Sequence, residues 1–280
     1  MDLFGPSRTP SLGEKSYVYV IVDDFSRYTW LLFLSEKNEV FYEFSKFCNN
    51  IQNEKGFTIT CIRSDHGREF ENIDFEKYCN ERGINHNFST PKTPQQNGVV
   101  ERKNRTLQEM AKTMLNENKL LKYFWFEAVN TSCYVSNRIL LRPILKKTPY
   151  KLRKNKKANI SYFKVFGCKC FILKTKDNLE KFDAKSNVGI FLGYSTLSKA
   201  FRVFNKRTMV VKESIHVIFD ESNNSFQEKE SFDDDLGLET SMGKLQIEYK
   251  RQQEEIREDP KKEESSLTLP PPQQVQSESS

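Results

Sequence analysis

The sequence lacks the features that define membrane-spanning, disulfide-stabilised and zinc-binding proteins. It has no run of the roughly 18–20 consecutive apolar residues that a membrane helix requires. Its six cysteines show no disulfide-framework spacing, and no secretory signal follows Met1, so we expect reduced thiols in an intracellular protein. With only three histidines and no Cys-x-x-Cys pair, the sequence predicts no tetrahedral zinc site.

Charge is unevenly distributed along the 280 residues. Residues 1–220 carry 37 basic and 23 acidic side chains, a net charge of +14, whereas residues 221–280 carry 7 basic and 15 acidic side chains, a net charge of −8. Such a basic body favours a polyanionic partner such as nucleic acid, although many basic proteins bind none.

The first 141 residues alternate between strand and helix patterns. Runs of β-branched and aromatic residues predict strands, and apolar residues at helical spacing predict helices. The expected order is strands at 16–23 and 29–35, a helix at 38–55, a strand at 57–65, a helix at 71–83, a strand at 84–89, a breaker-rich loop at 90–98, and helices at 99–116 and 122–141. This order predicts an α/β domain in which helices flank a mixed sheet.

The rest of the chain divides into three segments of different composition. We interpret residues 142–160 as a basic linker, because residues 142–185 hold 14 basic and only three acidic side chains. Short apolar runs separated by turn residues predict a small all-β barrel at 161–220. Residues 221–280 combine acids, Ser and Gln without apolar periodicity, which predicts a disordered acidic tail.

Three carboxylates are candidates for chemistry. Asp65 ends a predicted strand, and Asp2 lies near the start of a short first strand. Glu101 lies in the first turn of a predicted helix, and 35 residues separate it from Asp65. Metal-assisted phosphoryl transfer needs hard oxygen ligands that hold two ions about 3.5–4 Å apart. Two strand carboxylates and one helix carboxylate can converge on such a volume.

The helix that carries Glu101 has a polar and an apolar face. Arg105, Gln108 and Lys112 lie within roughly 40° of Glu101, at about 100° per residue. Leu107, Met110, Ala111 and Met114 lie on the opposite side. The polar face is either a surface for a metal-bound phosphate backbone or the solvated face of an ordinary amphipathic helix, and the pattern alone favours the second reading.

Several ordered motifs resemble the integrase core of copia-type retrotransposon Pol polyproteins, a core similar to retroviral integrases with a ribonuclease-H-like fold. They are MDLFGP, YVYVIVDDFSRYTW, IRSDHGREFEN and STPKTPQQNGVVERKNRTLQEMAKTML. Three later motifs resemble the small SH3-like β module that follows this core: KVFGCKCFI, KFDAKSNVGIFLGYS and MVVKESIHVIFDE. The resemblance covers about 220 residues.

The resemblance implies an enzyme that processes the 3′ ends of element DNA and transfers its strands into target DNA. Asp2, Asp65 and Glu101 would bind two Mg²⁺ or Mn²⁺ ions. The loop at 90–98 would be a mobile loop beside the active site. It further implies a homo-oligomer, a nuclear location for a functional protein, and DNA contacts from these residues: Arg105, Gln108, Lys112, Lys103, Gln95 and Asn97.

Alternatives remain at several positions. Asp23 and Asp24 compete with Asp2, but we interpret them as hairpin-turn residues, and we interpret His66 as a local hydrogen-bonding partner. The stretch at 146–157 either contacts DNA, acts as a nuclear signal or is solvated.

The chain begins one residue before Asp2, so we expect the first strand to pair incompletely and to hold Asp2 loosely. A catalytically inactive, transposon-derived DNA-binding remnant is therefore the alternative function. A third reading is a scaffold that binds a protein partner.

Overall fold

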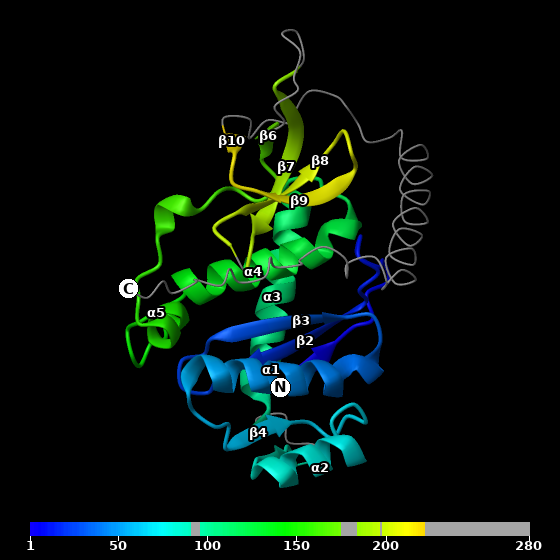
Figure 1. Cartoon of the computed structure of the whole chain (residues 1–280), viewed down its shortest axis with the longest axis vertical. Coiled ribbons are helices and arrows are strands. Elements are labelled where there is room, and N and C mark those ends of the chain that lie inside the picture. Colours follow the sequence, from blue (N-terminus) through cyan, green and yellow to red (C-terminus); the bar gives the residue numbers. More distant parts are fainter. Residues whose placement is uncertain (91–95, 175–183, 197, 222–280) are drawn as a thin grey trace, which may run out of the picture. The chain divides into compact units, whose positions relative to one another are not determined.

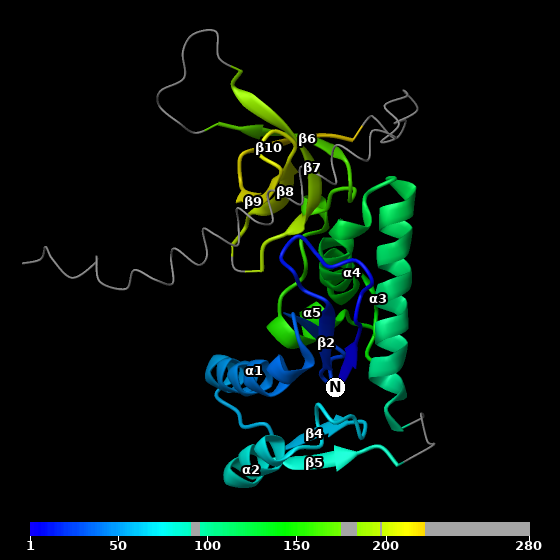
Figure 2. The same ribbon diagram turned by 90° about the vertical axis from the view of Figure 1, so that its right-hand side faces the viewer.

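A computed structural model of the chain describes residues 1–90, 96–174, 184–196 and 198–221 (Figures 1 and 2). Residues 1–228 form one compact unit. The predicted acidic tail at 221–280 lies outside the described residues, apart from Glu221. None of the helices in the described ranges combines the length and the apolar character that a membrane span requires.

The N-terminal strands form a three-stranded antiparallel sheet in the order β1-β2-β3. Its strands are β1 (Asp2–Phe4), β2 (Tyr17–Val22) and β3 (Thr29–Leu34). The predicted hairpin is confirmed, since Tyr17 pairs with Leu34 and Val22 pairs with Thr29. Residues Val18 to Val20 are fully buried, as a strand covered on both faces should be.

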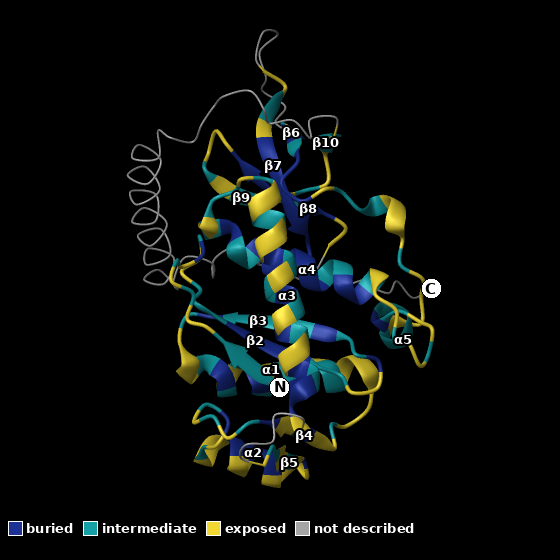
Figure 3. Cartoon of the chain, turned by 180° about the vertical axis from the view of Figure 1, so that it is seen from behind, coloured by how far each residue is buried: buried dark blue, intermediate teal, exposed yellow. Residues whose placement is uncertain are grey.

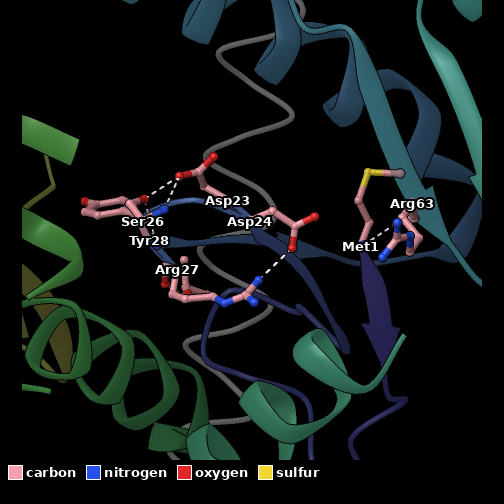
Figure 4. A network of polar contacts seen from close by, with 8 residues as sticks. Met1, Asp23, Asp24, Ser26, Arg27, Tyr28 and Arg63 are labelled. Atoms are coloured by element: carbon pink, nitrogen blue, oxygen red, sulfur yellow. Dashed lines mark hydrogen bonds and ion pairs between the residues drawn. The ribbon is translucent and has the colours of Figure 1, made fainter. Parts of the chain in front are cut away.

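The turn between β2 and β3 uses the two aspartates that compete with Asp2 (Figure 4). The backbone nitrogen and hydroxyl of Ser26 donate to one oxygen of Asp23, at 2.7 and 2.5 Å. Arg27 forms an ion pair with Asp24 at 2.6 Å. These bonds close the turn locally, which supports the interpretation of Asp23 and Asp24 as turn residues.

The next segment forms a parallel pair of strands joined by a helix (Figure 2). Its elements are a 3₁₀ turn (Lys37–Glu39), α1 (Val40–Lys55), β4 (Cys61–Ser64), α2 (Ile73–Arg82) and β5 (Asn85–Phe88). Both helices end at a glycine with positive φ, Gly56 at +68° and Gly83 at +65°, a conformation that glycine adopts without strain. The parallel pairing follows from the helical crossover, because a tight turn can only join antiparallel strands.

Within the described ranges, the predicted mixed sheet is present as two sheets, β1-β2-β3 and β4-β5. The amine of Met1 donates to the carbonyl oxygen of Arg63 at 2.5 Å and so links β1 to β4 (Figure 4). One hydrophobic cluster spans both sheets and the two helices, and its largest fully buried members are Tyr19, Phe44, Phe70, Phe75 and Leu34.

Two long helices follow, α3 (Gly98–Glu117) and α4 (Trp125–Ile139), the second preceded by a 3₁₀ turn (Lys122–Phe124). Helix α3 packs against α4 and β2. Helix α4 is fixed to β3 by Asn137, whose side-chain oxygen accepts from the backbone nitrogen of Thr29 at 3.0 Å and whose nitrogen donates to the carbonyl of Thr29 at 2.8 Å. This buried pair satisfies all four polar groups that it involves.

The segment expected to be a basic linker contains a short helix, α5 (Pro149–Lys154), and a 3₁₀ turn (Ile160–Tyr162). Thr148 caps α5 by accepting from the backbone nitrogen of Lys151 at 3.2 Å, and Pro149 occupies the first turn. The guanidinium of Arg153 lies over the ring of Trp30 and forms an ion pair with Glu54 at 3.2 Å. Tertiary contacts therefore stabilise a helix too short to persist alone.

The predicted all-β module is confirmed as a five-stranded antiparallel sheet in the order β10-β6-β7-β8-β9. Its strands are β6 (Lys169–Leu173), β7 (Ser186–Tyr194), β8 (Phe201–Asn205), β9 (Val210–Ser214) and β10 (Val217–Asp220). Cys170, Phe191 and Val203 are fully buried at its centre. Burial raises the pKa of the Cys170 thiol to about 12, so this thiol stays protonated and uncharged within the core of the module.

The module contacts helix α4 through β7 and β8. The hydroxyl of Thr131 donates to the carbonyl of Leu192 at 2.7 Å, and Arg202 donates two hydrogen bonds to Glu127, at 2.8 and 2.6 Å. Gly193, at φ +148°, allows this approach, because a Cβ there would lie 2.2 Å from the Thr131 hydroxyl.

Candidate active site

Asp2 and Asp65 are brought into electrostatic contact by strands that are distant in sequence. Strand β1 places Asp2 opposite Val20 of β2, and Asp65 directly follows the last residue of β4. Burial, followed by the charge of Asp65, raises the pKa of Asp2 to about 6. A carboxylate whose pKa is raised by burial and by the charge of a second carboxylate marks a site that favours a proton or a cation.

Asn104 of α3 holds the carboxylate of Asp2. Its side-chain nitrogen donates to one Asp2 oxygen, and its side-chain oxygen is buried without a hydrogen-bond partner. An unpartnered buried carbonyl of this kind costs about 1–3 kcal/mol. An amide oxygen is also a hard ligand of the type that divalent cations prefer. The expectation that Asp2 is loosely held is therefore wrong, since Asp2 is paired on its backbone and bonded on its side chain.

Glu101 lies one helical turn before Asn104 and is exposed. In the described part of the chain, no group of three or more His, Cys, Asp or Glu side chains is placed to share a metal ion. The structure thus brings two carboxylates of the predicted triad together and does not complete the site with Glu101. The three-residue assignment stays a prediction that requires Glu101 to approach Asp2 and Asp65.

The two faces of α3 are as the sequence predicts. Exposed and buried positions alternate along α3 (Figure 3). Arg105 and Lys112 are exposed and Gln108 is half-buried, on the same side as Glu101, whereas Leu107 and Ala111 are buried. This face therefore presents two cations and an amide to solvent beside the candidate site. Whether it contacts DNA stays a prediction.

The other three residues predicted to contact DNA are placed differently. Burial lowers the pKa of the Lys103 ammonium, which lies near Cys133 of α4. Asn97 is 5% exposed, and its carbonyl accepts the backbone nitrogens of Val100 and Glu101 at the start of α3, at 3.1 and 3.3 Å. Gln95 lies outside the described residues. The DNA contacts of all three stay predictions.

The backbone around Asp65 is fixed by two hydrogen bonds. Asp65 accepts from the backbone nitrogen of Gly67 at 3.2 Å, and the buried hydroxyl of Ser64 donates to the Asp65 carbonyl at 3.0 Å. Since the hydrogen of that hydroxyl is engaged by the Asp65 carbonyl, the hydroxyl oxygen accepts a hydrogen bond from Nε2 of His86 at 2.8 Å. Burial lowers the pKa of His86 to about 4, so a neutral imidazole supports the end of β4.

A cavity of about 250 Å³ adjoins the candidate site between β2 and β4. Its lining includes Met1, Asp24, Arg63 and the apolar side chains of Trp30 and Ile62. Burial lowers the pKa of the Met1 amine to about 6, so most of this amine is neutral at pH 7.

Sequence reasoning missed Asn104 and His86. Asn104 interrupts an apolar stripe formed by Val100, Leu107 and Ala111, and a polar residue on such a stripe is the signal that could have identified it. The signal at His86 is weaker. It lies in a short strand among polar neighbours, and its partner Ser64 is recognisable only in the folded chain.

Two family models match the chain. Residues 1–94 match the integrase core domain, and residues 168–233 match the retroviral polymerase SH3-like domain. Among solved structures, the HTLV-2 integrase catalytic core domain in complex with magnesium (trimeric form) is 20% identical, covering 49% of this chain and 84% of that chain with a TM-score of 0.38. A simian T-cell lymphotropic virus intasome in complex with PP2A regulatory subunit B56 gamma is 16% identical over 71% and 72% of the two chains, with a TM-score of 0.42.

The similar curated proteins are retrovirus-related Pol polyproteins of plant transposons. That of transposon TNT 1-94 from Nicotiana tabacum is 39% identical over 221 residues, which are 79% of this chain and 17% of that protein. That of transposon RE1 from Arabidopsis thaliana is 34% identical over 76% of this chain and 15% of that protein. The chain spans less than a fifth of the length of these relatives. The chain therefore carries an integrase core domain followed by a retroviral SH3-like domain, and it belongs with the copia-type retrotransposon Pol polyproteins.

Proposed function

We propose that this chain carries out the metal-dependent polynucleotidyl transfer of DNA integration. The observation that carries the proposal is the electrostatic contact of Asp65 with a buried Asp2, whose carboxylate is held by the amide nitrogen of Asn104, in an integrase core domain. The two carboxylates repel each other, and a bound cation would relieve this repulsion. Their oxygen atoms are the kind of ligand that Mg²⁺ and Mn²⁺ prefer.

Asp2 and Asp65 would hold a divalent cation, and Glu101 would have to approach them for a second ion to be held. Divalent cations at such a site stabilise the charge that develops on phosphate oxygens during an in-line displacement. The solved HTLV-2 catalytic core is described as a complex with magnesium. The chain's own part is to hold the carboxylates, through the β1–β2 pairing for Asp2 and the Ser64 and Gly67 bonds for Asp65.

The proposed reaction has two displacements at phosphorus. In end processing, a water oxygen bonds to phosphorus while the bond from phosphorus to the 3′ oxygen of the element strand breaks. That 3′ oxygen takes up a proton to become a 3′-hydroxyl, and the released piece leaves with the phosphate on its 5′ end. In strand transfer, that hydroxyl oxygen bonds to a target phosphorus while the bond from phosphorus to the target's 3′ oxygen breaks, and the departing oxygen takes up a proton. In this proposal Arg105, Gln108 and Lys112, which lie on the side of α3 that faces solvent, hold the phosphates.

The proposed partners are element ends and target DNA, held by a homo-oligomer in the nucleus. The net charge of +14 on residues 1–220 supports a polyanionic partner. The relative from simian T-cell lymphotropic virus is described as an intasome.

The test is strand transfer by the full chain with Mg²⁺, using Asp65→Asn and Glu101→Gln. Each carboxylate is expected to contribute several kcal/mol of transition-state stabilisation, so each variant should lose more than about 100-fold in rate. Asp74→Asn and Glu109→Gln are matched controls, because both side chains are exposed and lie on α2 and α3 away from the candidate site. Unchanged transfer in both test variants would rule out the metal-triad assignment.

A second candidate function is that of a catalytically inactive DNA-binding remnant. The observation that favours it is that the described residues do not assemble three metal-ligating side chains. This function predicts DNA binding that weakens steeply with salt and no cutting at any Mg²⁺ concentration. A salt titration of binding, run beside a nicking assay on the same preparation, separates the two functions.

A further inference from the structure

A column of aromatic rings leads from the interior of α2 to the surface beside Asp65. The ring centroids of Phe75 and His86 are 5.9 Å apart, those of His86 and Phe88 are 4.0 Å apart, and those of Phe88 and His66 are 5.0 Å apart. Phe75 is fully buried and His66 is exposed. The column therefore joins the hydrophobic core to a surface ring that is adjacent in sequence to a candidate catalytic carboxylate.

The inner part of the column is fixed. Phe75 packs against Phe44 and Phe70, with centroids 5.0 and 6.0 Å away. His86 is held by the 2.8 Å hydrogen bond to Ser64, whose hydroxyl also bonds the Asp65 carbonyl. The same hydrogen bonds thus set the position of the column and of the Asp65 backbone.

The outer ring is oriented before any ligand arrives. The imidazole of His66 is nearly parallel to the ring of Phe88, at an interplanar angle of 20°, and its Nδ1 lies 3.0 Å from a carboxylate oxygen of Glu71. The side chain of His66 is nevertheless 43% exposed. A flat ring that is stacked on one face and held at its edge loses little conformational entropy when its other face is covered.

We propose that the exposed face of His66 stacks against an unpaired nucleobase at the DNA end that is presented to Asp65. The inference rests on the proposed function. Every base has a π face, and stacking of one base on an aromatic side chain contributes about 1–3 kcal/mol. A base inside a duplex has both faces covered by its neighbours, so the partner is a terminal or frayed nucleotide rather than continuous duplex.

The surroundings of the column supply polar groups for such a nucleotide. An open hollow beside His86 and Phe88 is lined by Arg63, Asn87 and Gln96. Arg63 carries the positive charge that a phosphate requires, and the two amides can bond to base edges. The competing explanation is that the column only packs α2 onto β4 and β5, in which case His66 affects stability and not DNA.

The test uses DNA with 2-aminopurine as an unpaired 3′-terminal base, because stacking quenches the fluorescence of this base. Binding is measured without divalent metal, so that the readout does not depend on catalysis. The full chain and His66→Phe should quench the probe, whereas His66→Ala and His66→Gln should quench less and bind about 5- to 100-fold more weakly. Tyr42→Ala is the matched control, because Tyr42 is an exposed aromatic residue of α1.

His66→Ala and His66→Gln both lack the aromatic ring, but Gln keeps a polar group that can bond Glu71. A loss of quenching in both variants is therefore not explained by misfolding of one of them. Equal quenching and affinity in wild type and in a folded His66→Ala or His66→Gln protein would overturn the proposal. The proposed function fails separately: Asp65→Asn should retain quenching while losing strand transfer. Quenching by a chain that transfers no strand would overturn the enzymatic function and leave the stacking site in place.

Discussion

The side-chain amide of Asn104 donates a hydrogen bond to the carboxylate of Asp2, 102 positions away in the sequence. This bond ties helix α3 to strand β1 at the point where Asp65 also approaches. Because Glu101 lies one turn earlier on α3, the same contact determines how far Glu101 is from the other two carboxylates. Asn104 is thus a positioning residue for the whole candidate site.

Replacing Asn104 should affect metal binding more than folding. Asn104→Ala removes a hydrogen bond to a charged group, worth about 1.5–3 kcal/mol, but it also removes a buried carbonyl whose lack of a partner costs about 1–3 kcal/mol. The free energy of unfolding should therefore change little, whereas Mn²⁺ affinity should fall about 10- to 100-fold. Titration calorimetry and urea unfolding measure the two quantities, with Asn116→Ala on the exposed side of α3 as control. Unaltered Mn²⁺ affinity would remove Asn104 from the site.

Two groups should oppose each other in the pH dependence of stability. Burial and Asp65 raise the pKa of Asp2 to about 6, so the stability contributed by protonated Asp2 is present below pH 4 and lost as the pH rises through 6. Burial lowers the pKa of His86 to about 4, so stability is lost as the pH falls from 6.5 through 4. In the wild type the two effects largely cancel.

Removing either group should expose the effect of the other. Asp2→Asn should lose roughly 2 kcal/mol of unfolding free energy between pH 6.5 and 4, after allowance for partial exposure of His86. His86→Gln should instead gain stability over the same interval. Urea unfolding at several pH values measures both. Identical pH profiles for wild type and both variants would contradict these titrations.

In the ion pair that anchors the β module to α4, replacing Arg202 should cost more stability than replacing Glu127. Glu127 accepts both of its bonds from Arg202, whereas Arg202 also pairs with Glu213 at 3.3 Å. Hydrogen bonding to Glu127 raises the pKa of Arg202 above its usual range. Arg202→Met leaves the charge of Glu127 buried and should cost about 3 kcal/mol, while Glu127→Gln leaves Arg202 a partner and should cost about 1 kcal/mol.

A double-mutant cycle of Arg202 and Glu127 with urea unfolding checks this ion pair, and Glu117→Gln, at an exposed position of α3, is the control. A larger loss of unfolding free energy for Glu127→Gln than for Arg202→Met would contradict this prediction.

The basic stretch at 146–157 should contribute to DNA binding through its exposed lysines. Arg153 and Lys154 are engaged by Glu54, whereas Lys156 and Lys157 are exposed. Replacing Lys156 and Lys157 together by Gln should lower the slope of log affinity against log salt by up to about 2. An exposed pair elsewhere, Lys77 and Lys122, is the control. An unchanged slope would favour the solvated-segment interpretation.

Most helices and strands of the fold were predictable because their apolar periodicity is strong. The hairpin of β2 and β3 and the helix α3 match the expected ranges to within two residues. The strand expected at 57–65 is shorter, because only Cys61–Ser64 have partners in the four-residue strand β5. The length of a strand depends on its neighbour, which a single run of residues does not reveal.

Helix α5 and Asn104 show why the rest required the folded chain. The residues of α5 have no apolar stripe, and contacts with Trp30, Glu54 and the Arg138–Tyr150 stack stabilise the helix. The spacing of Asp65 and Glu101 was readable from the sequence, but the bond from Asn104 to Asp2 joins segments whose proximity only tertiary structure creates. Whether two strands pair in parallel or antiparallel likewise depends on the segment that connects them, and not on the residue pattern within each strand.

The most direct test of the account is Mn²⁺ binding to the full chain, followed by the loss of the free-ion signal in electron paramagnetic resonance. Wild type should bind Mn²⁺, and Mg²⁺ should displace it. At pH 6 binding should release protons, because the pKa of Asp2 is about 6 and a cation favours its charged form. Asp2→Asn and Asp65→Asn should each weaken binding at least about tenfold, while Asp74→Asn should not. Equal Mn²⁺ affinity in wild type and in both variants would contradict a metal site built on Asp2 and Asp65.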